Sequence, residues 1–155
     1  MIILSVEKRQ ELIKATQQLV EEAIERGDGP FAAVLIDESG TIIESATNTT
    51  RTTINPTAHA EINLISKAKK ANLSEYGVVV NAAPCPMCMT GLIKAKVRTL
   101  YYGAPPEDSA DPYITPEEIA SKSKHKIEIV SGILADECKQ QIARGKAKLL
   151  SAPTA

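Results

Sequence analysis

Two short segments of the sequence place residues that bind metals close together along the chain. One residue separates His59 from Glu61, and two residues separate Cys85 from Cys88. Residues three apart at the start of a helix lie on one face, so both thiols are expected to point toward one metal ion. The unpaired N–H groups and the positive end of a helix favour the thiolate, which is the form of cysteine that binds metal.

One imidazole and two thiolates form a ligand set that suits zinc. Zinc in proteins is usually four-coordinate, and catalytic sites leave the fourth position to water. We therefore predict that His59, Cys85 and Cys88 hold one catalytic Zn²⁺ ion per chain. The other two candidate ligands are expected elsewhere, with Cys138 as a small core residue and His125 at the surface.

Glu61 is predicted to act on the water rather than to bind the metal. An offset of two residues turns its side chain about 200° around a helix from His59. From that position a carboxylate can take a proton from water and pass it to a ring nitrogen and then to a leaving amine. A Cys-x-x-Cys pair alone would also suit a redox motif or a structural zinc site, but the added His-Ala-Glu favours catalytic zinc.

The composition is that of an ordinary globular protein. The chain has 155 residues, 43% of them hydrophobic and 24% charged, which suits one domain over 1–150 and a loose tail over 151–155. The net charge of −1 lacks the basic surplus that is typical of nucleic-acid-binding proteins. An odd number of cysteines and the lack of a long apolar run favour the cytoplasm and no membrane span.

The hydrophobic pattern predicts helices alternating with strands, and hence an α/β layered fold. Ser5 is expected to cap a first helix and Gly27 to end it. Strands over 32–37 and 41–46 should form a hairpin, and the later helix-then-strand order indicates parallel pairing, so the sheet should be mixed. The other expected elements are helices over 58–71, 87–95 and 134–146, a short helix capped by Thr115, and strands over 77–80, 98–102 and 126–130.

The two metal-binding segments together resemble the zinc deaminases of the cytidine deaminase superfamily, which carry His-x-Glu followed by Pro-Cys-x-x-Cys. The resemblance extends over roughly residues 29–143. It implies a three-layer α/β/α fold with a central five-stranded mixed sheet, and zinc held at the N-termini of two helices. It also implies hydrolytic exchange of an exocyclic amino group for oxygen on a nucleobase-like ring, and a homodimer.

Individual segments resemble different branches of this superfamily. Residues 29–34 are similar to the opening strand of guanine deaminases and related nucleobase deaminases, and residues 55–61 to both those enzymes and bacterial tRNA adenosine deaminases. Residues 132–138 resemble the tRNA enzymes, although the C-terminal helix lacks their aromatic residues. Ala83 departs from the family, which often has glutamate before the Pro-Cys pair.

The resemblance also implies which residues bind the substrate. Asn48 is expected to hydrogen-bond the substrate ring, and Phe31 lies in the segment that resembles the guanine deaminases. The backbone N–H groups of Ala60 and Cys85 would face the attacking oxygen or the base. Asp111, in an acidic loop, is a candidate for the aspartate that assists proton transfer in guanine deaminases; the alternative is a solvated turn residue.

Three functions are compatible with these observations. The first is zinc-dependent deamination of a small nucleobase or nucleoside, with guanine as the first choice and cytosine or a related heterocycle next. The second is a tRNA adenosine deaminase that forms inosine, and the third is a non-catalytic, zinc-containing partner subunit. The tRNA hypothesis draws on residues 132–138 and on the basic final helix, whose other interpretation is a solvated face.

The dimer that the resemblance implies has one candidate surface in the sequence. The apolar or small residues of the helix after the cysteines could serve it, or could equally be plain core: Met89, Leu92, Ile93 and Ala95.

Overall fold

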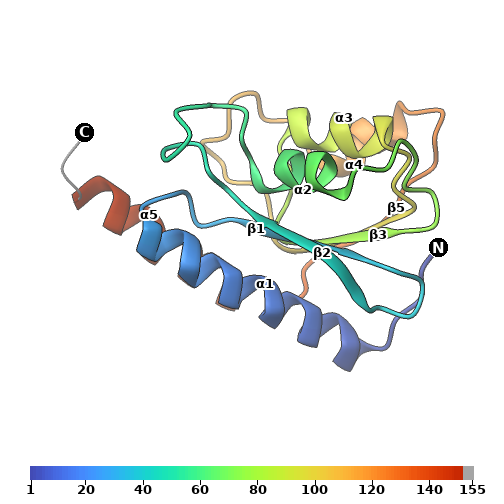
Figure 1. Ribbon diagram of the computed structural model, residues 1–155, viewed down its shortest axis with the longest axis horizontal. Coiled ribbons are helices and arrows are strands. Elements are labelled where there is room, and N and C mark those ends of the chain that lie inside the picture. The colour runs from blue at the N-terminus through green and yellow to red at the C-terminus, as the bar shows by residue number, and fades with distance from the viewer. Residues whose placement is uncertain (152–155) are drawn as a thin grey trace.

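A five-stranded sheet in the order β2–β1–β3–β4–β5 forms the centre of the molecule, and helices cover it on both sides (Figure 1). The computed structural model describes residues 1–151. Its elements are α1 Val6–Arg26, β1 Ala32–Ile36, β2 Ile42–Thr47, α2 Ala60–Ala68, β3 Gly77–Ala82, α3 Pro86–Lys94, β4 Thr99–Ala104, α4 Pro116–Ser121, β5 Glu128–Val130 and α5 Ala135–Ser151.

The sheet is mixed, as predicted. Strand β1 pairs antiparallel with its hairpin partner β2 and with β3, whereas β4 runs parallel to β3 and β5 runs parallel to β4. Every residue of β1, β3 and β4 is buried, which is typical of strands covered on both faces.

Two helical layers enclose the sheet. Helices α1 and α5 pack on one face, and α2, α3 and α4 gather on the other (Figure 1). Apolar side chains form a core on each side, one around Leu64 and Leu92 and the other around Ile13 and Val79. The prediction of a three-layer α/β/α fold is therefore confirmed.

The predicted helix signals act as expected. The Ser5 hydroxyl accepts a hydrogen bond from the Lys8 N–H at 3.1 Å and caps α1. Gly27 ends that helix with φ 92°, in the left-handed region that favours glycine. Thr115 caps α4 in the same way as Ser5 caps α1.

Strands β3 and β4 continue two residues beyond the predicted ends, to Ala82 and Ala104. Asn81, a residue type that usually favours turns, is fully buried in β3. Its side chain accepts a hydrogen bond from the Ala32 N–H and donates one to the Pro30 carbonyl, both at 3.0 Å. These partners satisfy the amide, so the strand continues through it.

The ends of two helices also differ from prediction. Helix α2 is shorter, because Lys69 adopts a left-handed conformation after Ala68. Helix α5 continues to Ser151, the first residue of the predicted tail; residues 152–155 lie outside the described part of the chain.

Several residues with alternative predictions are now placed. Cys138, Met89 and Leu92 are fully buried, so the core interpretation holds for them. The expectation of an exposed His125 is only partly met: the residue is half-buried, and its Nε2 lies 2.7 Å from the Val97 carbonyl. Within residues 1–151, no helix is long and apolar enough to cross a membrane.

Candidate active site

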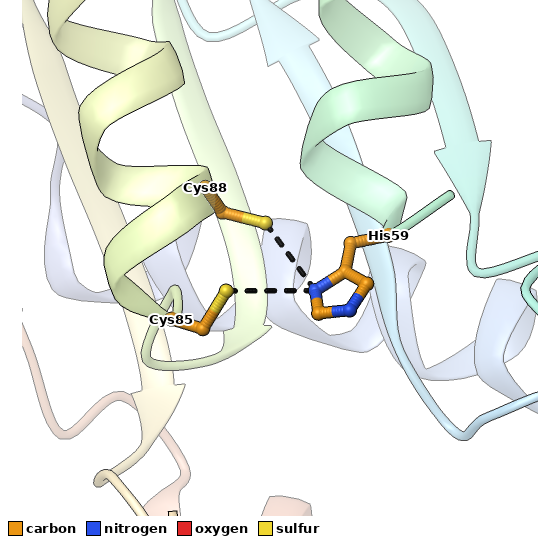
Figure 2. A group of neighbouring side chains, drawn as sticks. All are labelled: His59, Cys85 and Cys88. Atoms are coloured by element: carbon orange, nitrogen blue, oxygen red, sulfur yellow. Dashed lines mark hydrogen bonds between the residues drawn. The ribbon is translucent and has the colours of Figure 1, made fainter. Parts of the chain in front are cut away.

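The three predicted metal ligands converge at the starts of two neighbouring helices. His59 is the N-cap of α2, Cys85 is the N-cap of α3, and Cys88 lies in the first turn of α3. The Sγ atoms of Cys85 and Cys88 lie 3.5 and 3.4 Å from His59 Nδ1, and all three atoms point toward one another (Figure 2).

Local sequence explains why the two helices start at this point. Pro86 occupies the first turn of α3, where its missing N–H costs no hydrogen bond. Gly91 allows α2 and α3 to approach, since a Cβ there would lie 3.1 Å from Ile62 Cδ1 of α2. The close packing of the two helices brings their N-termini together.

The geometry of the three side chains fits zinc. With Zn–S near 2.3 Å and Zn–N near 2.0–2.1 Å at tetrahedral angles, sulfur and nitrogen should be roughly 3.5 Å apart. The observed distances between His59 Nδ1 and the two sulfurs, 3.4 and 3.5 Å, agree with this value. His59, Cys85 and Cys88 could therefore hold one zinc ion.

The pKa shifts of the three side chains also favour a bound metal ion. The adjacent Cys88 thiol and the His59 ring lower the pKa of Cys85 to about 4. The hydrogen bond with Cys85 and burial raise the pKa of Cys88, and the hydrogen bond with Cys85 raises the pKa of His59. The three side chains by themselves thus stabilise a thiolate at Cys85 and disfavour a second thiolate at Cys88. A dication between the sulfurs would stabilise both thiolates.

Glu61 lies beside these ligands, in the first turn of α2. Its side chain is buried, and burial raises its pKa to about 7. A carboxyl group with a pKa near neutrality suits both acceptance and release of a proton. Glu61 and His59 line the same pocket, so the carboxyl group faces the space next to the metal ligands.

A pocket of about 760 Å³ opens next to the metal ligands. It lies beyond the carboxyl ends of β3 and β4, the usual place for a ligand in an α/β sheet. Its other walls come from the loop after β4 and from α5. The lining includes Phe31, Asn48, His59, Glu61, Ala83, Cys85, Glu107, Asp108, Tyr113, Lys139, Ile142 and Lys146.

Asn48 presents a donor to this pocket. Its Oδ1 accepts hydrogen bonds from the Thr50 N–H at 3.0 Å and the Thr50 hydroxyl at 2.9 Å. Among the described residues, nothing accepts a hydrogen bond from Asn48 Nδ2. The amide NH₂ is therefore the part of the side chain that is left for a ligand.

Comparison with known proteins decides the family. The family described as the cytidine and deoxycytidylate deaminase zinc-binding region matches residues 6–104. The chain belongs to this family. It is a nucleobase or nucleoside deaminase, a hydrolase of carbon–nitrogen bonds.

Relatives of this deaminase fall into more than one branch. It is 28% identical over 148 residues to the tRNA-specific adenosine deaminase of Haemophilus influenzae, covering 86% of this chain and 80% of the relative. It is 34% identical over 104 residues to the guanine deaminase of Bacillus subtilis, covering 64% and 66%. A crystal structure of an NE0047 variant in complex with 8-azaguanine superimposes with a TM-score of 0.80 at 26% identity, covering 90% of this chain and 86% of that one.

The structure brings most of the predicted site residues of the deaminase together, but not all. Phe31, Asn48, His59, Glu61 and Cys85 line the pocket, and Cys88 is buried behind it. The role expected of the Ala60 backbone N–H stays a prediction, since only the side chain of Ala60 is placed, fully buried in the core. Asp111 is exposed and lies outside the pocket lining; Asp108 of the same loop lines it. Ala110 and Pro112, on either side of Asp111, also line the pocket, so the loop itself stays at the cavity. The sequence pattern does not predict which side chains of this loop face it.

One wall of the pocket was missed by the sequence analysis. Four residues of α5 face the cavity of the deaminase at helical spacing: Lys139, Ile142, Ala143 and Lys146. Their i, i+3, i+4, i+7 spacing places them on one side of the helix, but two of the four are lysines, so the apolar pattern does not mark this face. Lys146 pairs with Glu107 across the pocket mouth, and its ammonium lies 5.9 Å from the centre of the Phe31 ring. Helix α5 thus closes the pocket from the side opposite the metal ligands.

Proposed function

We propose that this deaminase acts on a small nucleobase or nucleoside, with guanine as the first substrate and cytosine or a related heterocycle next. The observation that supports this proposal is the pocket that Glu61 and Asn48 share with two of the metal ligands, His59 and Cys85. Its volume of about 760 Å³ suits a small-molecule site. Guanine comes first because the Bacillus subtilis relative is a guanine deaminase and NE0047 was crystallised with 8-azaguanine.

The residues of the pocket account for the reaction. Zinc held by His59, Cys85 and Cys88 would lower the pKa of water to about 7 and so supply a nucleophile at neutral pH. The Glu61 carboxylate accepts a proton from water while the new C–O bond forms at the ring carbon, and it passes that proton to the ring nitrogen. It then carries the hydroxyl proton to the amino group, the C–N bond breaks, and ammonia leaves as the carbonyl forms.

Asn48 and Phe31 hold the ring during these steps. The Asn48 NH₂ donates to an acceptor on the heterocycle, such as a carbonyl oxygen or a ring nitrogen. The Phe31 side chain, half-buried at the pocket wall, offers an apolar face to the ring. Together they bind the ring in the pocket that Glu61 also lines.

A second candidate, tRNA adenosine deamination, draws on one specific observation. A shallow groove of about 570 Å³ continues outward from the pocket and shares Phe31, Asn48, His59 and Lys146 with it. Over residues 1–151, its lining includes Arg51 and Lys146 but no acidic side chain. Such a groove suits a phosphate backbone. The acidic loop on the other side of the pocket and the Glu107–Lys146 pair favour the small substrate.

We also infer a homodimer in the cytoplasm. The dimer rests on the family resemblance, and light scattering on the purified protein tests it. The cytoplasm is supported by the cysteines, all three of which lie in the described region and are free. Free thiols suit a reducing compartment.

The substrate is tested by comparing kcat/KM for guanine, cytosine, their nucleosides and an adenosine-containing anticodon stem-loop. We expect guanine to give the highest value. A higher value for the stem-loop, with affinity that falls steeply as salt is added, would replace the small-substrate proposal by the tRNA candidate.

A further inference from the structure

The segment between β2 and α2 carries two parts of the active site at its ends. It begins with Asn48 and leads directly into His59, and residues 48–58 form turns without helix or strand. The position of this segment, and with it the direction of the Asn48 amide, therefore depends in part on hydrogen bonds that reach the segment from elsewhere in the chain.

Asp28 supplies the largest set of these bonds. Its side chain is fully buried just after the end of α1. Oδ1 accepts from the backbone N–H groups of Arg51 and Thr52, at 3.1 and 2.9 Å. Oδ2 accepts from Arg26 Nε at 2.6 Å and from the Thr52 hydroxyl at 2.9 Å. The buried carboxylate is thus neutralised and fully hydrogen-bonded, as a buried charge must be.

Arg26 extends this set of bonds to Asn48 itself. Its Nη2 donates to the Asn48 carbonyl at 2.9 Å and to the Thr47 hydroxyl at 2.8 Å. The Arg26–Asp28 pair therefore hydrogen-bonds the chain on both sides of the Asn48–Thr50 turn: Arg26 binds Thr47 and the Asn48 carbonyl, and Asp28 binds Arg51 and Thr52. The Thr50 N–H and hydroxyl, within that turn, and the Gly29 N–H donate to Asn48 Oδ1. Among residues 1–151, this leaves the NH₂ group without an acceptor and available to the pocket.

We propose that Asp28 is a positioning residue of the active site, which acts with Arg26 to aim the Asn48 amide at the substrate ring. Asp28 does not line the pocket, so it contacts neither substrate nor metal. The proposal rests on the proposed function, in which Asn48 binds the ring. An uncharged asparagine at this position would lose the ion pair, and its NH₂ would face either Arg26 or the N–H groups of the turn. In either orientation, hydrogen bonds on one side of the turn are lost.

Steady-state kinetics of Asp28→Asn with the best small substrate test the proposal. We expect KM to rise at least tenfold and kcat to change less than threefold, with one zinc per chain retained. Because the ring is then bound more weakly in the ground state and in the transition state alike, KM rises while kcat changes little. An unchanged KM, or a fall in kcat through loss of zinc, would overturn the positioning role.

A double-mutant cycle shows whether Asp28 acts through Asn48. In an Asn48→Ala background, Asp28→Asn should lower kcat/KM by less than twofold, because the residue it aims is absent. An equal loss in both backgrounds would contradict the proposal.

Asp37→Asn is the matched control. Asp37 also accepts from two backbone N–H groups and a hydroxyl, but in the β1–β2 turn and away from the pocket. It should leave kcat/KM within twofold.

Two further measurements cover other outcomes. If Asp28→Asn does not fold, Arg26→Lys keeps the charge beside Asp28 but loses the two Nη2 bonds, and the same rise in KM is expected.

If the wild type turns over no small substrate, the proposed function fails. The positioning role is then tested by NMR, as a shift or broadening of the Asn48 side-chain NH₂ signals in Asp28→Asn relative to the wild type and Asp37→Asn. Unchanged signals would overturn it.

Discussion

The protonation of Glu61 sets the chemistry that this site can perform. The carboxyl group is buried, lies two residues from a metal ligand and has a pKa raised to about 7 by burial. It is therefore able to exchange protons near neutral pH without serving as a ligand. The metal ligands hold the ion and Glu61 moves the protons, so the two roles can be separated by substitution.

Replacing Glu61 by glutamine tests this separation. The amide has a similar shape but cannot accept a proton, so turnover should fall by roughly 10²–10⁴-fold or more. Zinc content, measured by atomic absorption, should remain at the wild-type level. His59→Ala is the comparison variant, in which zinc and activity should be lost together. Loss of zinc from Glu61→Gln would assign Glu61 to the metal.

The pH profile follows from the same residue. The ionised form of Glu61 accepts the proton, so kcat/KM should be constant at alkaline pH and fall about tenfold per pH unit below the pKa of this group. The limb should lie at or below pH 7, because a dication beside the carboxylate lowers its pKa from the value of about 7 that burial produces. Zinc content is measured at each pH as the control. A profile that stays flat down to the lowest pH at which zinc is retained would contradict the role of Glu61.

At the scale of elements, helix starts and close packing determine the site. Helices α2 and α3 present their N-termini to one point, and α5 closes the pocket because it lies against α1 and the sheet. Gly145 makes that contact possible. A Cβ at this position would lie 2.6 Å from Pro30 Cβ and 2.9 Å from Ile24 Cδ1.

Gly145→Ala should therefore destabilise the protein although alanine is the better helix former. Overpacking costs about 1–3 kcal/mol, against a gain of roughly 1 kcal/mol from helix propensity. We expect Tm, measured by calorimetry, to fall by a few degrees. Ala147→Gly at an exposed position of the same helix measures the propensity term alone. A rise in Tm for Gly145→Ala would show that α5 can move away from Pro30 at no cost.

The elements could be predicted from the sequence where a local signal marks them. Ser5 and Gly27 bound α1, an apolar run marks β1 and a β-branched run marks β3, so the layered fold followed. The end of β3 could not be predicted, because the buried Asn81 depends on partners 49 and 51 residues away. The same limit applies to Asp28, whose bonds join segments more than 20 residues apart.

Within the site, spacing identified the residues whose roles are set by chemistry. His59, Cys85 and Cys88 have short motifs, and the resemblance added Asn48. Loop residues lack such a pattern. Asp108 lines the pocket and Asp111 does not, and no periodicity in the loop predicts this difference.

At the scale of the whole molecule, the metal should contribute to stability. Its ligands come from two helices that begin 26 residues apart, so only the folded chain brings them together. A ligand at 1,000 times its Kd adds about 4.1 kcal/mol, and for a protein of this size 1 kcal/mol shifts Tm by roughly 2–4 °C. Removal of zinc by a chelator should therefore lower Tm by roughly 10 °C, and added zinc should restore it. Cys85→Ala protein should not respond, and an unchanged wild-type Tm would show that zinc is not bound in the folded protein.

The most direct test of the central claim is ammonia release by zinc-loaded protein from a panel of free bases and nucleosides, with Glu61→Gln as the control. We expect guanine or another aminated heterocycle to release one ammonia per oxo product, and the variant to lose this activity while keeping zinc. No release from any member of the panel, or equal release by the variant, would contradict small-molecule deamination through Glu61.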